Sequence, residues 1–220
     1  MSGIIIGLFL LAAYLFGSIP TGYLVAKALK GIDIRQYGSG GTGATNVLRN
    51  VGKGAALAVL AIDVLKGSAA VLLAKYGYPW VAAQAELSVS PGAIAWIVTA
   101  ASLLVLIGHS RSVWINFMGG KSAASGLGIL LAMAWPVAIG ALFVFIGVLA
   151  ISRIVSLSSV GAAIAAFVLM VVTHQPLPYA LLGLAGGLYV ILRHQSNIRR
   201  ILAGTEPRLG SNRSSQSPQA

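Results

Sequence analysis

The sequence predicts an all-α integral membrane protein, because it is apolar, poor in charge and arranged in long hydrophobic runs. Of its 220 residues, 57% are hydrophobic and 9% are charged, whereas soluble domains carry about 25% charged residues. The apolar residues gather in segments of roughly 20, the length that a helix needs to cross a bilayer. We therefore expect membrane-spanning helices joined by short basic loops.

Six apolar segments are long enough to be considered as spans. The first contains Gly17, Pro20 and Gly22, which loosen its second half, and it lacks the basic start and cleavage site of a signal peptide. We interpret it as a retained span. After the last segment the chain becomes rich in Ser, Gln and Pro, which predicts one transmembrane domain over 1–203 and a disordered tail over 204–220. The six segments are 4–26, 54–74, 92–108, 126–150, 154–173 and 177–192.

The fourth segment decides the topology, because Pro136 lies near its middle. A single crossing would put Lys121 and Arg153 on opposite sides of the membrane. A break at Pro136 makes the segment a hairpin and places the basic loops and the basic C-terminal region on one side. Lys and Arg favour the cytoplasmic side. We therefore predict seven transmembrane helices, with the N-terminus outside and the C-terminus cytoplasmic.

The charge balance points to a membrane rather than to nucleic acid. The formal net charge is +11, from 15 basic and 4 acidic residues, and on a soluble domain this excess would indicate nucleic-acid binding. Here the bases lie between apolar segments, so lipid head groups and topology explain them better. We expect membrane lipids and no nucleic acid as partners, while anionic substrates remain open. The absence of cysteine excludes a thiolate nucleophile.

The first basic loop has the composition of an anion-binding loop. Four glycines fall within residues 38–43, and successive N–H groups in such a loop can form a nest for an anion. Ser39, Thr45 and Asn46 add polar side chains, and Arg49 adds a guanidinium suited to phosphate. A flexible linker is the alternative. The glycine pattern also matches a dinucleotide fingerprint, but that motif needs a preceding strand and a βαβ unit, which membrane helices exclude.

The second loop contributes His109 and Lys121. Lys121 precedes the next helix, whose N-terminal N–H groups and dipole favour an anion. The alternative for Lys121 is a charge that serves topology alone. The alternative for His109 is a residue that simply lies at a helix end. Arg153 and Ser159 form a third cluster, for which a positive-inside charge followed by capping hydroxyls is the ordinary explanation.

The last span ends in a fourth polar cluster. Arg193 is followed by His194 and Asn197, which lie three residues apart and share one helix face if the helix continues. Asp63 and Lys66 are also three apart, within the second apolar segment. Intramembrane ions are usually paired and turned inward, so we favour a structural pair over a catalytic one.

Taken together, these motifs resemble those of the acyl-phosphate:glycerol-3-phosphate acyltransferase family of bacterial membranes. The resemblance runs from residue 17 to residue 206, and two departures are Gly41-Thr42 in place of Asn-Pro and residues 122–125 in place of Gly-Val-Ala-Thr. The motifs that carry it are Gly38-Ser-Gly40, Gly43-Ala-Thr-Asn46 with Arg49, Asp63 with Lys66-Gly67, Gly108-His109 with Gly119-Gly-Lys121, Val155-Ser-Leu-Ser-Ser159, and Arg193-His194 with Asn197-Ile198.

The resemblance implies a seven-helix enzyme that needs no metal and no cofactor. It implies transfer of an acyl chain from acyl phosphate to the sn-1 hydroxyl of glycerol 3-phosphate. The products are lysophosphatidic acid and phosphate, in the first step of phospholipid synthesis. The expected location is the bacterial inner membrane, with the active site on the cytoplasmic face. An enzyme that produces acyl phosphate is a candidate partner.

The resemblance and the residue chemistry together assign roles. A substrate phosphate is expected to take the hydroxyl proton, with His194 as the alternative base because histidine ordinarily titrates near neutral pH. The predicted catalytic residues are Ser39, His194 and Asn197. Predicted phosphate ligands are Thr45, Asn46, Arg49, Lys121 and Ser159. Supporting positions are Asp63, Lys66, His109, Arg153 and Arg193.

Two other classes of function would share part of this pattern. A carrier or channel for small anions would also place glycines and cations beside membrane helices, but it predicts cations near the midplane and an inverted repeat, and neither is visible. A purely structural membrane protein would not need so many polar loop residues. Other glycerol-phosphate acyltransferases place an Asp five residues after a His, whereas Trp114, Tyr179 and Arg199 occupy those positions here.

Overall fold

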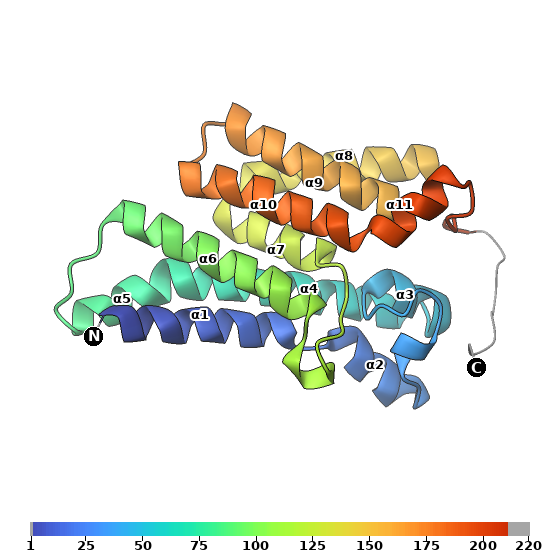
Figure 1. The fold of residues 1–220 in the computed structure, drawn as a ribbon, viewed down its shortest axis with the longest axis horizontal. Helices are drawn as coiled ribbons and strands as arrows, with labels where there is room; N and C mark the ends of the chain where they lie inside the picture. Colours follow the sequence, from blue (N-terminus) through green and yellow to red (C-terminus); the bar gives the residue numbers. More distant parts are fainter. Residues whose placement is uncertain (1, 211–220) are drawn as a thin grey trace.

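The computed structural model describes residues 2–210, which form a bundle of helices without a β-strand in that range (Figure 1). Seven helices run along the bundle: α1 (Ser2–Ser18), α4 (Lys53–Leu72), α6 (Pro91–Ser110), α7 (Ala123–Met133), α8 (Trp135–Ser152), α9 (Val155–Val172) and α10 (Leu177–Arg193). Shorter elements are α2 (Thr21–Lys30), α3 (Ala44–Asn50), α5 (Tyr78–Gln84), α11 (Gln195–Leu202), the 3-10 turns η1 (Ile34–Gln36) and η3 (Val113–Ile115), and the π-helical turn η2 (Leu73–Gly77).

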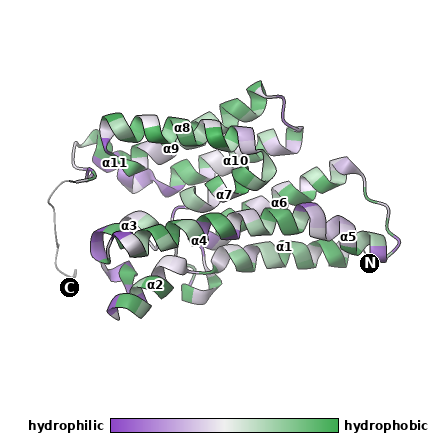
Figure 2. Cartoon of the chain, turned by 180° about the vertical axis from the view of Figure 1, so that it is seen from behind, coloured by the Kyte–Doolittle hydropathy of each residue, from purple (hydrophilic) through white to green (hydrophobic). Residues whose placement is uncertain are grey.

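The α7–α8 break confirms the predicted hairpin. The two helices run in opposite directions, so the loops that carry the basic residues gather at one end of the bundle, together with α3 and α11 (Figure 1). Figure 2 shows hydrophilic residues concentrated at this end and mostly apolar helices beyond it. The break falls at Ala134 rather than at Pro136, which lies in the first turn of α8. Proline is tolerated there because its missing N–H would have no helical partner.

The number of membrane crossings stays a prediction. Within residues 2–210, five helical units are long and apolar enough to cross, and the α10–α11 pair, bent by 61°, would be a sixth. Helix α7 has 11 residues, which at 1.5 Å per residue span about 16 Å, roughly half of the hydrocarbon core. The five units are Ser2–Lys30, Lys53–Gln84, Pro91–Ser110, Trp135–Ser152 and Val155–Val172.

The first span is broken where its sequence is loosest. Helix α1 ends at Ser18 and α2 begins at Thr21, with Pro20 between them. The ammonium of Lys66 donates a hydrogen bond of 2.9 Å to the Ile19 carbonyl at this break. A buried lysine in α4 therefore adds a charge-assisted bond to a carbonyl at the break, which also accepts from the Thr21 N–H at 3.0 Å.

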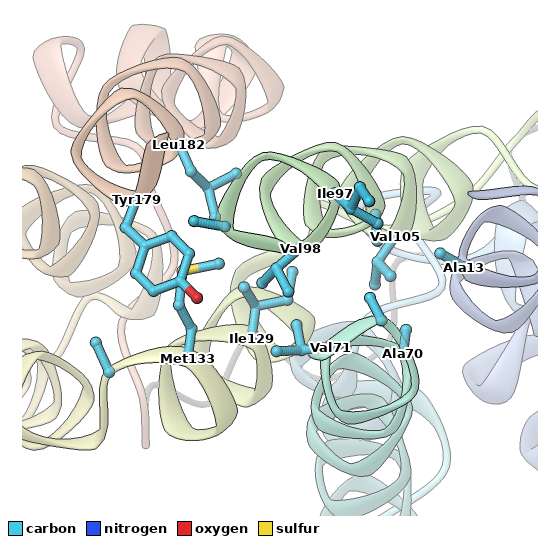
Figure 3. Packing of buried hydrophobic residues seen from close by; sticks show 14 of the residues in the cluster. Ala13, Ala70, Val71, Ile97, Val98, Val105, Ile129, Met133, Tyr179 and Leu182 are labelled. Carbon is cyan, nitrogen blue, oxygen red and sulfur yellow. The ribbon is translucent and has the colours of Figure 1, made fainter. Parts of the chain in front are cut away.

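The apolar core lies between α1, α4, α6, α7 and α10. Figure 3 shows Val98 and Val105 of α6 facing Val71 of α4, with Ile129 of α7 beside them. The α4 and α7 backbones approach closely at Gly128, where an added Cβ would lie 1.9 Å from the Val64 carbonyl oxygen. This contact fixes α7 beside the centre of the bundle although α7 is short.

Residues 204–210, which the sequence assigns to the predicted tail, contact the helical bundle in the structure. We expected disorder from residue 204 onward, but a turn at Gly204 folds the next residues back onto the bundle. There the Leu209 N–H donates to the Arg153 carbonyl at 2.7 Å, and the Glu206 side chain is buried. This segment therefore contributes a side chain, Glu206, to the polar end of the bundle. The remainder of the predicted tail lies outside the described residues.

Candidate active site

A cavity of about 330 Å³ opens at the basic end of the bundle and continues between the helices. It is polar at its mouth and apolar further in. The polar lining collects residues from the first loop, the second loop and the helices α3, α9 and α11, which lie up to 158 residues apart in sequence. The predicted site residues among them are Ser39, Thr45, Asn46, Arg49, Lys121, Ser159, His194 and Asn197, joined by Asp63 and His109.

Asn46 organises the glycine-rich loop. Its amide nitrogen lies 3.1, 2.9 and 2.9 Å from the carbonyl oxygens of Ile34, Tyr37 and Gly41, which share its two hydrogens. Its amide oxygen accepts from the Ser39 N–H at 3.2 Å. Because these bonds occupy the amide, the structure does not support the predicted phosphate contact of Asn46. Its side chain instead fixes the shape of the loop.

The other residues of this loop present side chains to the cavity. Ser39 is exposed, and the Asn46 bond to its backbone fixes its position. Thr45 lies in the first turn of α3, and Arg49 lies one turn later on the same helix. The Arg49 guanidinium donates to the Pro207 carbonyl at 3.4 Å, a long bond to an uncharged group. Its charge is therefore available to an anion in the cavity.

Lys121 begins a chain of hydrogen bonds across the cavity mouth. Its ammonium donates to the Asn197 side-chain oxygen at 2.5 Å, and the Asn197 amide nitrogen donates to Glu206 at 2.6 Å. Burial is the main cause that lowers the pKa of Lys121 to about 8, and Arg200, Arg193 and Arg49 add to this by repulsion, while Glu206 partly offsets it. Lys121 thus stays mainly protonated near neutral pH but titrates far more readily than an ordinary lysine.

Glu206 is the residue that the sequence prediction missed. Its carboxylate also accepts from Ser156 at 2.7 Å and pairs with Arg200 at 2.7 Å. Burial raises its pKa, but the bonds from Asn197, Ser156 and Arg200 outweigh that effect and hold the pKa below its usual value. A signal was present in the composition: only four acids face 15 bases, and a carboxylate beside a basic cluster is expected to pair.

His194 has a defined proton arrangement. Its Nδ1 lies 2.8 Å from the Val190 carbonyl oxygen, which can only accept, so Nδ1 carries the hydrogen. In the neutral ring, Nε2 is then the acceptor. The helix does not continue past His194, which lies at the bend between α10 and α11, and Asn197 lies in α11. Both side chains are buried and line the cavity.

Arg193 and Arg153 lie outside the cavity lining. Arg193 donates to the Gly120 carbonyl at 3.3 Å and so ties α10 to the loop before Lys121. Arg153 is exposed with a positive φ at the end of α8, and its carbonyl holds Leu209. Ser159 lines the cavity, but its hydroxyl donates to the Val155 carbonyl at 3.0 Å.

Asp63 and Lys66 form the predicted buried pair, with 2.7 Å between the ammonium and the carboxylate. Thr21 donates to the same oxygen at 3.0 Å, and Nδ1 of His109 lies 3.6 Å from it. The other ring nitrogen of His109 faces Gly120, where an added Cβ would lie 2.2 Å from Nε2. The cluster therefore connects the break in the first span to the loop that carries Lys121.

The inner part of the cavity is apolar and runs between α7, α8, α9 and α10. Leucine, alanine and glycine side chains dominate there. No group of three or more His, Asp or Glu side chains within residues 2–210 is arranged to hold a metal ion. The arrangement thus joins cations and hydrogen-bond donors at one end to a hydrocarbon-like channel at the other, which suits a substrate with an anionic head and an acyl chain.

Comparison with known proteins identifies the family. The family described as "Glycerol-3-phosphate acyltransferase" matches residues 7–204. The chain belongs to this family. A glycerol-3-phosphate acyltransferase from Acaryochloris marina is 54% identical over 207 residues, covering 93% of this chain and 92% of the relative. Another, from Synechococcus sp. (strain JA-3-3Ab), is 56% identical over 201 residues and covers 91% of both chains.

Two solved structures have the same fold. The crystal structure of PlsY (YgiH), an integral membrane glycerol 3-phosphate acyltransferase, in its glycerol 3-phosphate form has a TM-score of 0.82 at 36% identity, covering 93% of this chain and 96% of that chain. The lysophosphatidic acid form gives 0.79 at 35% identity, with 93% and 95% covered. This member of the family is therefore a multi-pass membrane protein.

Proposed function

We propose that the protein transfers an acyl chain from acyl phosphate to the sn-1 hydroxyl of glycerol 3-phosphate, forming lysophosphatidic acid and inorganic phosphate. Membership of the glycerol-3-phosphate acyltransferase family supports the acceptor, as do the glycerol 3-phosphate and lysophosphatidic acid forms of the related structures. The donor and the position of the acceptor hydroxyl are our inferences.

The single observation that carries the proposal is the two-part cavity. Arg49 and Lys121 face a polar mouth, and the same cavity continues into an apolar channel. Both proposed substrates carry phosphate, so their mutual repulsion must be offset by cations and N–H donors in a partly dry site. The channel gives the acyl chain an apolar environment while its activated carbonyl stays beside the polar residues.

The proposed reaction is a direct transfer. The acceptor oxygen forms a bond to the acyl carbonyl carbon, the bond from that carbon to the phosphate oxygen breaks, and phosphate leaves with the electron pair. A substrate phosphate oxygen takes the hydroxyl proton. Nε2 of neutral His194 can accept a hydrogen bond from the acceptor hydroxyl, and it is the alternative proton acceptor. Because an acyl phosphate is already activated, positioning supplies much of the rate.

Ser39 orients substrate in this mechanism and forms no acyl-enzyme. Ser39→Ala should therefore slow turnover severely, while donor alone should leave no acyl group on the protein. Intact-mass measurement after incubation with acyl phosphate tests this point, with Ser39→Ala as the blank. A stable increase by one acyl group that disappears in Ser39→Ala would replace direct transfer with a two-step mechanism.

The donor test uses purified protein in detergent with radiolabelled glycerol 3-phosphate. Lysophosphatidic acid should form from palmitoyl phosphate without acyl-CoA, and EDTA should leave the rate unchanged. Palmitoyl-CoA alone is the matched control and should give no product above background. Comparable turnover from the CoA ester, or complete loss on chelation, would refute the proposed donor or the metal-independent chemistry, respectively.

The active site is proposed to lie on the cytoplasmic face of the bacterial inner membrane, because the basic loops gather at the end of the bundle where the cavity opens. Single cysteines at Gly41 and the exposed Ser196 should react with an impermeant maleimide only in inside-out vesicles. A cysteine at Tyr76, near the opposite end, should react only in right-side-out vesicles. The reverse pattern would place the site outside.

A further inference from the structure

We propose that the apolar channel is closed at its inner end by Met133, Met170 and Tyr179, and that this end sets the acyl-chain length that the enzyme prefers. The inference rests on the proposed function, since it takes the channel as the acyl site. It adds the residues that determine specificity within that site.

Helix α10 gives the length of the channel. Its cavity-lining residues run from His194, at the reaction end, to Leu182. Twelve residues of helix at 1.5 Å each correspond to about 18 Å. An extended chain with carbon–carbon bonds near 1.5 Å advances about 1.25 Å per carbon. The channel therefore accommodates about 14 carbons before it reaches Leu182.

Small residues keep the channel open along its length. Ala162 and Ala166 line it on α9, one helical turn apart, and Gly183 and Gly186 line it on α10. A Cβ added at Gly186 would lie 3.0 Å from a Leu106 methyl group, so even one carbon at this position would be in tight contact. Larger side chains at the alanine positions would occupy space that the acyl chain needs.

Large buried side chains follow immediately beyond this segment. Met170 lies one turn after Ala166 and is 0% exposed, and its Cγ is 3.4 Å from the position that a Cβ on Gly183 would take. Met133 of α7 and Tyr179 of α10 are also buried at this level (Figure 3). None of the three lines the cavity itself. They are packed behind its innermost lining residues, as Met170 is behind Gly183, and so block its extension in this direction.

The test measures donor preference within each variant. The purified enzyme is assayed with acyl phosphates of 10 to 18 carbons, and the ratio of kcat/KM values for 16 and 12 carbons is compared. Ala166→Leu should lower that ratio at least about tenfold, because an apolar pocket that lacks room for one methylene discriminates by about 10- to 200-fold. Ala162→Leu, one turn nearer the reaction end, should move the optimum to chains about five carbons shorter still.

Met170→Ala should act in the opposite direction, raising the ratio of kcat/KM for 18 over 14 carbons by about tenfold. Ala165→Leu is the matched control: it makes the same change on the same helix at a residue that does not line the cavity, and its ratios should equal those of the wild type. Because each ratio comes from one preparation, the fraction of folded enzyme cancels.

The outcomes separate this inference from the proposed function. If the wild-type enzyme used none of the acyl phosphates as a donor, whatever their chain length, the proposed function itself would be refuted. If the variants were active but preferred the same chain length as the wild type, only the inference of a closed channel would be overturned. Such a result would mean that the chain leaves the protein sideways, past the partly exposed Leu142.

Discussion

Two ionic clusters lie at the basic end of this bundle, and they differ in how their charges are balanced. In the first, Asp63 pairs with Lys66 at 2.7 Å and both side chains are buried within the protein. In the second, Glu206 is the single carboxylate among several cations, of which Lys121 and Arg49 face the cavity. A balanced buried pair serves the fold, whereas a cluster with surplus positive charge is suited to bind an anion.

The largest expected effect comes from breaking the balanced pair. Asp63→Asn leaves the Lys66 ammonium buried without its counter-ion, which should cost about 3–5 kcal/mol of stability. Thermal unfolding in detergent measures this loss. The double variant Asp63→Asn/Lys66→Met removes both charges and should recover most of the stability. If the double variant were as unstable as the single, charge pairing would not be what Asp63 contributes.

Removing a cation of the second cluster should instead reduce activity. Lys121→Ala and Arg49→Ala should each lower kcat/KM for glycerol 3-phosphate by about 30- to 1000-fold, since a charge-assisted phosphate contact contributes about 2–4 kcal/mol. Both proteins should unfold near the wild-type temperature. Arg49→Lys should stay impaired, because an ammonium does not reproduce the guanidinium fork. A loss below threefold in either alanine variant would assign that residue to topology alone.

Glu206 tests how the second cluster is organised. Its hydrogen bond from the Asn197 amide nitrogen leaves the Asn197 oxygen facing Lys121. Glu206→Gln keeps the shape but loses the charge, so we expect a loss of about 1–3 kcal/mol divided between stability and turnover. Glu206→Asp is the control that retains the charge and shortens the reach. Full activity and stability in Glu206→Gln would show that its charge is unimportant.

The smallest expected effect is a pH dependence. The pKa of Lys121 is lowered to about 8 by burial, so its positive charge is present below pH 8 and disappears as the pH rises above it. kcat/KM for glycerol 3-phosphate should therefore fall by about tenfold per pH unit on the alkaline side. Lys121→Arg keeps its charge across this range, and any activity it retains should lack the fall. If kcat/KM of Lys121→Arg fell in the same way at alkaline pH, the titrating group would be a residue other than Lys121.

The sequence predicted the helices well because their signals are local. The apolar runs mark the spans, and Pro136 marked the α7–α8 hairpin to within two residues. The i, i+3 spacing of Asp63 and Lys66 predicted their contact, which the structure confirms. The break at Ile19 was visible only as a loosened helix, since its stabilising partner, Lys66, comes from another span.

Contacts that residue types alone do not reveal account for the other differences. Asn46 looked like a phosphate ligand because its residue type and its neighbours suit one, yet its amide is occupied by carbonyls of its own loop. The position of Glu206 depends on the chain folding back after Gly204, whose φ of 68° is a conformational choice that composition does not reveal. Ser39 and His194 lie 155 residues apart in sequence, and only the topology brings them to one cavity.

Direct binding of glycerol 3-phosphate tests the central distinction between the two clusters. Equilibrium binding of the radiolabelled substrate, without donor, is measured for the wild type, Lys121→Ala and Asp63→Asn/Lys66→Met. We predict at least a 30-fold rise in Kd for Lys121→Ala and a change within about threefold for the double variant, provided that both remain folded. A wild-type Kd in folded Lys121→Ala, together with lost binding in the double variant, would contradict the account.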